Sequence, residues 1–433
     1  MRRVKIEDLQ SRIGETVRVC AYVGALRLQR KMQFVILSDG SGSLQVTHRR
    51  GGADDEIEQQ LENLTPASAV AITGEVLRNE IVKLGGIELI PSKVEVLANS
   101  EAALPIGPES GPDVRQDWRF LDIRLHPERR FAFEVSAAVE MAIREFVQQE
   151  GFTELHTPKL MGTASESGAE VFKLDYFDRP AYLAQSPQFY KQMAIASGID
   201  KVFEVGPVFR AEPSFTSRHA TEFTGVDVEM AWIDDVEDVM QFKESMLRHM
   251  LERVRERYGQ QIRDAYGVDV VIPALPFPRI PLEEARRILV SRGWEQIEKA
   301  DLDPAGERMI SEYALQEFGS EFVYLTEYPT SVRPFYHMRP RAHITASFDL
   351  VWKGLEITTG AQREHRYDVL VSQAIEKGMD PEPMRSYLDI FRFGTPPHGG
   401  FGMGLNRVLM LLLGLPSIRD AIFLFRGPHR LEP

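Results

Sequence analysis

Three segments of the chain carry arginines and carboxylates at spacings that could bind a phosphorylated ligand. The first, KVFEVGPVFRAEPSFTSRHATEF over residues 201–223, places Arg210 at the end of a strand-like run. Glu212 follows two residues later, and Arg218 and His219 come after a short polar stretch. A guanidinium in front of a polar loop can form paired hydrogen bonds with a phosphate group, so this segment predicts an anion site.

The second segment, SFDLVWKGLEITTGAQREHR over residues 347–366, combines acidic and hydroxyl side chains. Asp349 and Glu356 lie on one hairpin-like unit, with Thr359 and Arg363 close by in the sequence. Two carboxylates and a hydroxyl are hard oxygen ligands, which suit Mg²⁺ bound to a triphosphate. The segment therefore predicts a magnesium site beside the anion site.

The third segment, PPHGGFGMGLNRVLMLLLG over residues 396–414, places Arg407 at the start of a strongly apolar helix after a glycine-rich strand. A charge at that position must either reach solvent or meet an anion. The sequence has no GxxxxGK[ST] motif, no GxGxxG between a strand and a helix, and no HExxH. A nucleotide bound here would be held in another way.

Each segment alone also fits an ordinary structural role. Strand-end arginines often form surface ion pairs, glycines often mark turns, and single carboxylates are usually solvated. The order of the three segments along one chain is more informative than any one of them.

Composition limits the classes of protein to consider. The chain has 433 residues, 43% hydrophobic and 27% charged, which is typical of a soluble globular protein with two or three domains. No apolar run approaches the roughly 18 residues of a membrane span, so no membrane association is expected. A single cysteine, Cys20, excludes intrachain disulfides and favours the cytoplasm.

Charge is unevenly distributed along the chain. The net charge is −13, yet residues 1–50 contain more Lys and Arg than Asp and Glu. A basic segment in an acidic protein suggests a local contact with a polyanion, whereas a solvated basic surface is the simpler explanation on charge alone.

The elements that must position these residues divide the chain into two domains. TVRVCAY, FVILSD, LQVTH, AVAITGEVL and SKVEVL predict short strands within residues 1–98, which favours a small barrel of the oligonucleotide-binding (OB) fold. Residues 99–125 contain Pro105, Pro108 and Pro112 and are typical of a linker or hinge.

From residue 126 onward the pattern changes to alternating helices and strands. Pro127 begins, and Gly151 ends, a long amphipathic helix whose apolar residues recur at helical spacing. Strand-like runs then alternate with helical ones as far as residue 433. We expect an α+β domain over 126–433, built on a mainly antiparallel sheet flanked by helices.

The segments together resemble the signature motifs of class II aminoacyl-tRNA synthetases, and in particular the aspartyl branch of that family. GFTELHTPKLM (151–161) resembles motif 1, and VFEVGPVFRAEP with RHATEFTGVDVEMA (202–213 and 218–231) resembles motif 2. GGFGMGLNRVLMLLLGLPSIRDAIFLF (399–425) resembles motif 3, and YLAQSPQFYKQ (182–192) is similar to the aspartyl signature. The resemblance covers nearly the whole chain and is to the short archaeal-type form.

The resemblance implies a two-step reaction. Aspartate attacks the α-phosphate of ATP to give aspartyl-adenylate, and a tRNA ribose hydroxyl then takes the aspartyl group. It assigns catalysis to Arg210 and Arg407, ATP binding to Arg210, Glu212, Arg218, His219, Glu356 and Arg407, and Mg²⁺ binding to Asp349, Glu356 and Thr359. Catalysis would depend on positioning of the substrates and on electrostatic stabilisation, without a protein nucleophile.

The resemblance also implies how the amino acid is selected. It assigns aspartate binding to Glu170, Ser186, Gln188, Lys191, Arg210, Asp227, Thr359 and Arg363. Aspartate and asparagine are nearly isosteric, so charge must separate them. With asparagine bound, the cations of Lys191 and Arg363 would lack a counter-charge, at a cost of several kcal/mol.

The barrel is expected to read the tRNA anticodon by stacking and hydrogen bonding to unpaired bases, with Phe34, Gln45 and Glu88 as candidates. Gln45 and Thr47 would share one strand face. Motif 1 implies a homodimer. The tRNA partner is tRNA(Asp), and the sequence leaves tRNA(Asn) open as a second substrate.

Three alternatives remain at this stage. An asparaginyl-tRNA synthetase conflicts with Lys191, and a tRNA-independent amide-forming relative typically lacks the barrel. A non-catalytic tRNA-binding paralogue would require decay of an ATP site whose residues are all present. One departure from the family pattern is Asn406, which stands before Arg407 where motif 3 usually has an acidic residue.

Overall fold

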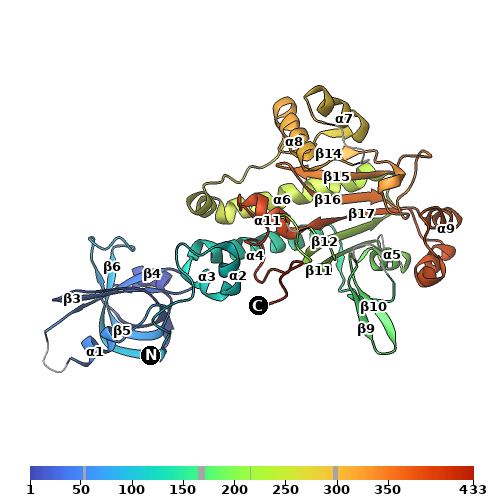
Figure 1. Ribbon diagram of the computed structural model, residues 1–433. Coiled ribbons are helices and arrows are strands. Elements are labelled where there is room, and N and C mark those ends of the chain that lie inside the picture. The colour runs from blue at the N-terminus through green and yellow to red at the C-terminus, as the bar shows by residue number, and fades with distance from the viewer. Residues whose placement is uncertain (52–54, 164–170, 215, 296–300) are drawn as a thin grey trace. The chain divides into compact units, whose positions relative to one another are not determined.

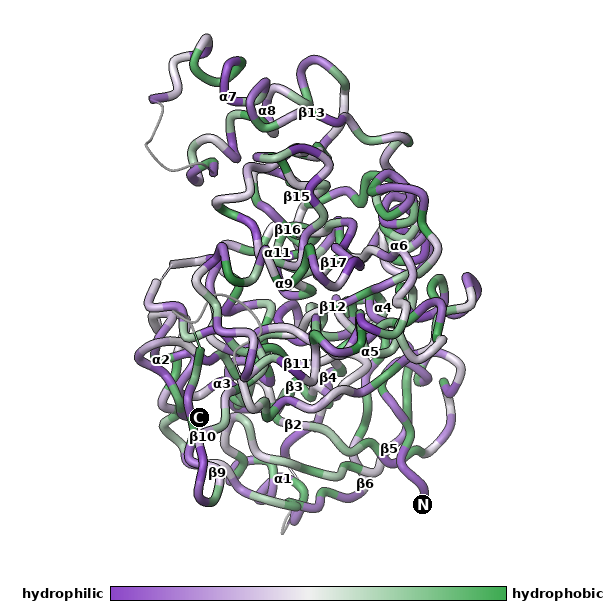
Figure 2. Tube along the Cα trace, turned by 90° about the vertical axis from the view of Figure 1, so that its right-hand side faces the viewer, coloured by the Kyte–Doolittle hydropathy of each residue, from purple (hydrophilic) through white to green (hydrophobic). Residues whose placement is uncertain are grey.

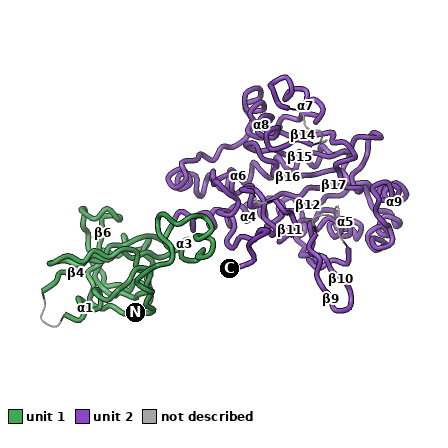
Figure 3. The backbone as a smooth tube through the Cα atoms, viewed as in Figure 1, with its two compact units in different colours: residues 1–127 green, residues 128–433 purple. Residues whose placement is uncertain are grey.

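The computed structural model describes residues 1–51, 55–163, 171–214, 216–295 and 301–433. The chain divides into the compact units Met1–Pro127 and Glu128–Pro433 (Figures 1 and 3). Hydrophobic and hydrophilic stretches follow one another along the chain in both units (Figure 2). None of the helices in these described ranges is both long and apolar enough to span a membrane.

Unit 1 contains a closed barrel, as the sequence predicts. Its strands have the order β1-β2-β3-β4-β6-β5, and pairing of β2 with β5 closes the sheet. Alternate residues such as Val19, Val35, Leu44 and Val46 fill the interior and are fully buried. The elements are β1 (Arg3–Val4), η1 (Ile6–Arg12), β2 (Thr16–Leu28), β3 (Met32–Ser38), β4 (Ser43–Arg49), α1 (Glu56–Glu62), β5 (Ala69–Arg78) and β6 (Ile87–Ala98).

The outer face of β3, β4 and β6 carries the candidate anticodon residues. Gln45 is opposite Glu88 in the β4–β6 register, and Phe34 is opposite Thr47 in the β3–β4 register. The Thr47 hydroxyl donates to Glu88 and accepts from Gln45 Nε2 at 3.0 Å. The expectation that Gln45 and Thr47 share a face opposite Leu44 and Val46 is confirmed.

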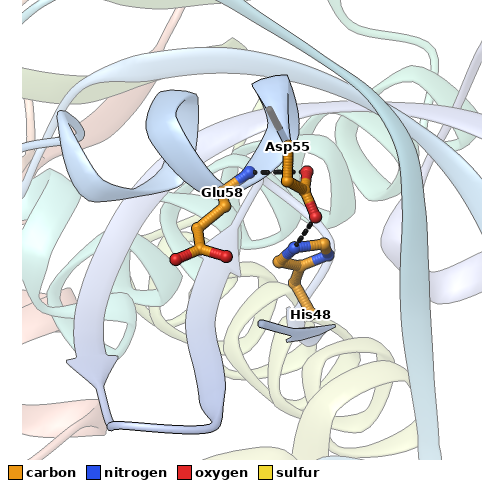
Figure 4. A group of neighbouring side chains, drawn as sticks. All are labelled: His48, Asp55 and Glu58. Carbon is orange, nitrogen blue, oxygen red and sulfur yellow. Dashed lines mark hydrogen bonds and ion pairs between the residues drawn. The ribbon is translucent and has the colours of Figure 1, made fainter. Parts of the chain in front are cut away.

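Helix α1 begins at a polar cluster beside the barrel (Figure 4). Asp55 caps the helix by accepting the Glu58 backbone N–H at 3.0 Å, and its other oxygen lies 2.9 Å from His48 Nε2. Arg50 pairs with the Glu58 carboxylate at 3.1 Å. Both carboxylates thus have side-chain partners, and Asp55 caps the N-terminus of α1.

The stretch expected as a linker contains the short helices α2 (Pro112–Asp117) and α3 (Arg119–Leu125). The fully buried carboxylate of Asp122 accepts hydrogen bonds from Arg115 at 2.9 Å and Arg119 at 3.1 Å. Ile106 and Leu121 pack against Ala67 of the barrel unit. The second half of this segment is therefore ordered by a buried ion network that its proline content does not predict.

Unit 2 is built on a mainly antiparallel sheet, as expected, with strand order β13-β14-β15-β16-β17-β12-β11-β7. Within this sheet, as far as the structure describes it, only β13–β14 and β7–β11 pair in parallel. The strands are β7 (Thr153–Glu154), β11 (Lys201–Phe209), β12 (Glu222–Ala231), β13 (Arg279–Pro281), β14 (Phe322–Thr326), β15 (Ser347–Trp352), β16 (Leu355–Gln362) and β17 (His398–Gly404). A smaller sheet has the order β8 (Leu160–Met161), β10 (Arg179–Leu183), β9 (Lys173–Tyr176).

Helices cover this sheet and form its core. The long helix predicted from Pro127 is α4 (Pro127–Gln149), which buries Val135, Val139 and Ile143 against the same cluster as Met246 of α6. α6 packs on β16 and β17, and α11 packs on β12 and β16. The other helices are α5 (Gln188–Ala196), α6 (Val236–Tyr266), α7 (Leu282–Ser291), α8 (Pro304–Phe318), η2 (Thr330–Val332), α9 (Tyr367–Glu376), η3 (Glu382–Met384), α10 (Arg385–Leu388), η4 (Asp389–Phe393) and α11 (Leu405–Leu412).

Strand β17 approaches its neighbours too closely for side chains on one face. A Cβ on Gly400 would lie 2.0 Å from the Val228 carbonyl oxygen and 2.5 Å from a Glu229 carboxylate oxygen. On the opposite face, Phe401 and Met403 enter the core with α6. The alternation of glycine with large apolar residues therefore allows β17 to lie directly beside the carboxylates of β12.

We expect Gly400→Ala to lower the free energy of unfolding of unit 2 by roughly 3 kcal/mol, because backbone and carboxylate would have to move. Urea denaturation followed by tryptophan fluorescence measures this. Gly162→Ala is the matched control, since a Cβ there meets nothing within 4 Å. Equal stability of the two variants would contradict the close approach.

Candidate active site

A cavity of about 400 Å³ in unit 2 brings the three arginine-containing segments together. Strand β17 contributes Gly402 and Gly404 to its lining, and β12 contributes Gly225. The cavity is lined by the following sequence-predicted residues: Ser186, Gln188, Arg210, Glu212, Arg218, His219, Asp227, Glu356, Thr359, Arg363 and Arg407. Residues far apart in the sequence thus meet because β11, β12, β17 and β16 are neighbours in one sheet.

Two of the predicted active-site residues that the structure describes are not in this lining. Lys191 and Asp349 are buried behind it in the part of the chain that the structure describes. Glu170 lies outside the described residues.

The carboxylate of Glu229 lies behind the cavity lining, where it contacts the lining residue Arg363, and it has no exposed surface. Arg363 donates to it through Nε at 2.9 Å and Nη2 at 3.4 Å. Lys191 Nζ lies 3.3 Å from the same carboxylate. Burial raises the pKa of Glu229, but Arg363 and Lys191 outweigh burial and hold that pKa below its ordinary value.

Lys191 acts on the cavity through a neighbour. Its ammonium lies 2.9 Å from Asp227 Oδ1, and it also donates to the carbonyl oxygens of Val228 and Phe401. Asp227 lines the cavity, whereas Lys191 is 1% exposed. The arrangement fixes an aspartate carboxylate at the cavity wall with a buried cation behind it.

Two neighbouring side chains orient the Arg363 guanidinium. Besides Glu229, its Nη1 lies 3.1 Å from Nε2 of His337, which must accept because a guanidinium can only donate. Burial lowers the pKa of His337 well below its usual range, and the charge of Arg363 adds to this effect. A neutral His337 is therefore available as the acceptor that holds the Arg363 fork in place.

The other end of the cavity is rich in arginine. Arg210 directly follows β11, as predicted, and its guanidinium lies over the Phe223 ring. Arg407 donates to the backbone carbonyl oxygens of Glu356 at 2.9 Å and Arg218 at 3.4 Å. These backbone contacts fix the Arg407 head group without neutralising its charge.

His219 and Glu212 are held by neighbouring hydroxyl groups in the same loop. Thr216 Oγ1 lies 2.7 Å from His219 Nδ1, and Ser214 donates to Glu212 at 2.5 Å. Burial lowers the pKa of His219, and the nearby charge of Arg407 lowers it further.

Asp349 and Glu356 lie on the β15–β16 hairpin, as the sequence predicts, and Asp349 is opposite Thr359 in the register. Glu356 accepts the Thr359 hydroxyl at 3.0 Å. Asp349 pairs with Arg333 at 2.6 Å, and burial raises the pKa of Asp349 to about 6 against the opposing effect of Arg333. Burial also raises the pKa of Glu356, but Arg407 and Arg333 outweigh it and leave that pKa lowered.

Asn406 ties the start of α11 to its surroundings. Its Oδ1 accepts the Thr224 backbone N–H at 2.9 Å, and its Nδ2 donates to the Ala421 carbonyl oxygen at 3.0 Å. A carboxylate could not donate the second of these hydrogen bonds. The departure from the family pattern therefore has a local structural role, and Arg407 keeps its place in the cavity.

A buried polar chain connects α5, which carries Lys191, to β17. The Tyr387 hydroxyl donates to Gln192 Oε1 at 2.8 Å, and Gln192 Nε2 lies 2.8 Å from His398 Nε2. His398 Nδ1 lies 2.8 Å from the Pro396 carbonyl oxygen, which fixes the proton on Nδ1. His398 is thus a neutral acceptor, and the chain sets the position of α5.

Sequence reasoning missed four residues of this region: Glu229, Arg333, His337 and Glu307. Glu229 lies two residues after Asp227 on β12, so strand periodicity could have placed it on the same face. Arg333, His337 and Glu307 lie in loops or on α8, where no local spacing points to the cavity. Their positions depend on tertiary packing.

These features define the class of the protein. Residues 111–426 match the family of class II tRNA synthetases (D, K and N), and residues 17–97 match the OB-fold nucleic acid binding domain. The chain belongs to the class II tRNA synthetases of this group.

Individual proteins of this family are similar to the chain over nearly its whole length. The chain is 42% identical to the aspartate–tRNA(Asp/Asn) ligase of Aeropyrum pernix, covering 99% of this chain and 98% of that protein. It is 39% identical to the aspartate–tRNA(Asp) ligase of Thermococcus kodakarensis, covering 97% of each. The structure of asparaginyl-tRNA synthetase from Pyrococcus horikoshii, complexed with asparaginyl-adenylate, is 33% identical with a TM-score of 0.92 and full coverage of both chains.

The stability of unit 2 should fall as the pH falls below neutrality. Burial lowers the pKa of His398 from 6.5 to about 4. Stability from the neutral imidazole is present above pH 6.5 and is lost as the pH falls to about 4, by roughly 3 kcal/mol. Urea denaturation of wild type and His398→Gln at several pH values measures this, and the variant should show a flatter dependence.

His156→Gln is the control for this prediction, because His156 is exposed. The control should keep the wild-type pH dependence. If His398→Gln kept it as well, the pH dependence would arise elsewhere.

Proposed function

We propose that the protein is an aspartate–tRNA ligase, which activates L-aspartate with ATP to aspartyl-adenylate and transfers the aspartyl group to the 3′ end of tRNA(Asp). The observation that carries the proposal is the charge of the cavity. Among the described residues, five arginines and three carboxylates line it, although the whole chain has a net charge of −13. Such a cavity favours a ligand with several negative charges.

The arginine-rich end is suited to the triphosphate of ATP. Arg210 would stabilise the charge that develops on the α-phosphate, and Arg407, Arg218 and His219 would hold the terminal phosphate end. Glu212 would contact the adenine. Because Arg407 is fixed by backbone carbonyls, its charge is available to the ligand without reorganisation.

The residues of the β15–β16 hairpin fit a magnesium ion. Asp349 Oδ1 is buried and has no hydrogen-bond partner among the described residues, as a ligand oxygen would before an ion binds. Asp349, Glu356 and Thr359 would hold the ion, which supplies positive charge to the phosphates.

The opposite end is suited to aspartate. Arg363, clamped by Glu229 and His337, would face the side-chain carboxylate, with Lys191 adding charge from behind Asp227. Ser186, Gln188 and Asp227 would surround the α-ammonium group, and Arg210 and Thr359 would complete the site. Glu170, outside the described residues, stays a candidate for closing over the substrate.

ATP–pyrophosphate exchange tests the activation step. We expect exchange with aspartate and at least a hundredfold less with asparagine, since a neutral amide would form a weaker contact than a carboxylate with the Arg363 guanidinium at the cavity wall. Arg210→Ala should lose at least about a hundredfold in kcat, because a preorganised charge is removed. Full activity of Arg210→Ala, or better exchange with asparagine, would contradict the proposal.

The proposal assigns anticodon binding to residues 1–98, connection to 99–125 and catalysis to 126–433. Phe34, Gln45 and Glu88 would contact the anticodon. The protein would act in the cytoplasm.

We propose that the protein is a homodimer. Leu160 in β8, Leu174 in β9 and Phe177 in the turn between β9 and β10 have exposed fractions of 49%, 40% and 91%, and these exposed apolar side chains support a protein partner. Light scattering at the mass of a single chain would contradict the dimer.

Gln45→Ala tests the anticodon assignment. We expect kcat/KM for aminoacylation of tRNA(Asp) to fall about tenfold, with ATP–pyrophosphate exchange unchanged, because only base recognition is lost. Gln59→Ala, at an exposed position of α1, is the control. The same assays with tRNA(Asn) decide whether the enzyme charges both tRNAs. An equal loss in exchange would show that Gln45 acts on folding instead.

A further inference from the structure

Arg218 is held at both its backbone and its side chain. Its carbonyl oxygen accepts from Arg407, and the carbonyl oxygen of Ser217 accepts the Ile418 backbone N–H at 2.7 Å. Its Nη1 donates to Glu307 Oε2 at 3.0 Å. Among the described residues, Nη2 and Nε of Arg218 have no protein partner, so part of its donor fork stays available to the cavity that it lines.

Glu307 is presented by a rigidly anchored helix. It lies in the first turn of α8, whose N-terminus is capped by Asp303, accepting the Gly306 backbone N–H at 2.8 Å. The Trp294 indole donates to the same Asp303 oxygen at 3.0 Å, and Ile310 and Ala314 of α8 are fully buried. The Glu307 side chain is 15% exposed and, within the described ranges, does not line the cavity.

We propose that Glu307 is a positioning residue for ATP, which aims Arg218 at the triphosphate from behind the cavity wall. A carboxylate behind the guanidinium occupies one Nη group and sets the plane of the fork, so the remaining N–H groups point toward the ligand before it binds. Because Glu307 lies outside the lining, it does not compete with the phosphates for the same space. This role rests on the proposed ATP site. It implies that α8, although outside the cavity lining, helps to position a residue of that site.

The alternative is an ordinary structural ion pair between α8 and the loop after β11. Such a pair would affect stability and leave the affinity for ATP unchanged. α8 offers a matched control for this alternative, since Glu317 on the same helix lies 3.5 Å from Arg292 at the surface.

The experiment measures KM for ATP and for aspartate in ATP–pyrophosphate exchange with the full-length chain. We expect Glu307→Gln to raise KM for ATP about tenfold, equivalent to about 1.4 kcal/mol, with KM for aspartate unchanged. Glu317→Gln should behave as wild type. Titration calorimetry with α,β-methylene-ATP should show the same loss of affinity without turnover.

A double variant distinguishes positioning from other effects. Arg218→Gln should also raise KM for ATP, and adding Glu307→Gln to it should cause no further change. An unchanged KM in Glu307→Gln, or an effect that persists in the Arg218→Gln background, would overturn the inference. If the wild type shows no exchange with aspartate, the proposed function fails; if wild-type exchange is normal and Glu307→Gln matches it, only the role of Glu307 fails.

Discussion

A carboxylate without exposed surface must be balanced by cations, and the site of this protein is arranged around that requirement at Glu229. Lys191 comes to it from α5 and Arg363 from the end of β16, so one buried charge fixes the relation of three elements. Removal of one partner of a buried ion pair typically costs about 3–5 kcal/mol, because the other charge is left uncompensated. The same pairing leaves Arg363 aimed at the cavity, with neutral His337 on its other side.

Strand β17 makes this arrangement possible. Its glycines leave room for the Glu229 and Asp227 carboxylates, while Phe401 and Met403 between them enter the core. Lys191 also donates to the Phe401 carbonyl oxygen, so the backbone of β17 is part of the charge network itself. The alternation of glycine with large apolar residues in β17 thus places apolar packing on one face of the strand and buried carboxylates on the other.

The two ends of the cavity differ in how their cations are balanced. At the Glu229 end, cations are paired with buried carboxylates. At the other end, the Arg407 guanidinium is held by backbone carbonyl oxygens and interacts with the Glu356 carboxylate only through its charge, and Arg210 is placed by the end of β11. This difference underlies the proposal that one end binds the amino acid and the other the triphosphate. Asn406 shows that the start of α11 can be anchored by an amide in place of an acidic residue.

The sequence by itself determined the barrel, the long helix from Pro127, the strand that ends before Arg210 and the hairpin of Asp349 and Glu356. These features depend on local periodicity, on proline and glycine punctuation and on motif spacing, all of which are readable along the chain. The helices within residues 112–125 were not predicted, because the buried charge of Asp122 that orders them is visible only after folding. Likewise, only the tertiary structure decided that Lys191 lies behind Asp227 and that Arg333, His337 and Glu307 surround the site. Their placement depends on which strands become neighbours and which charges are buried, and neither is encoded in the spacing of nearby residues.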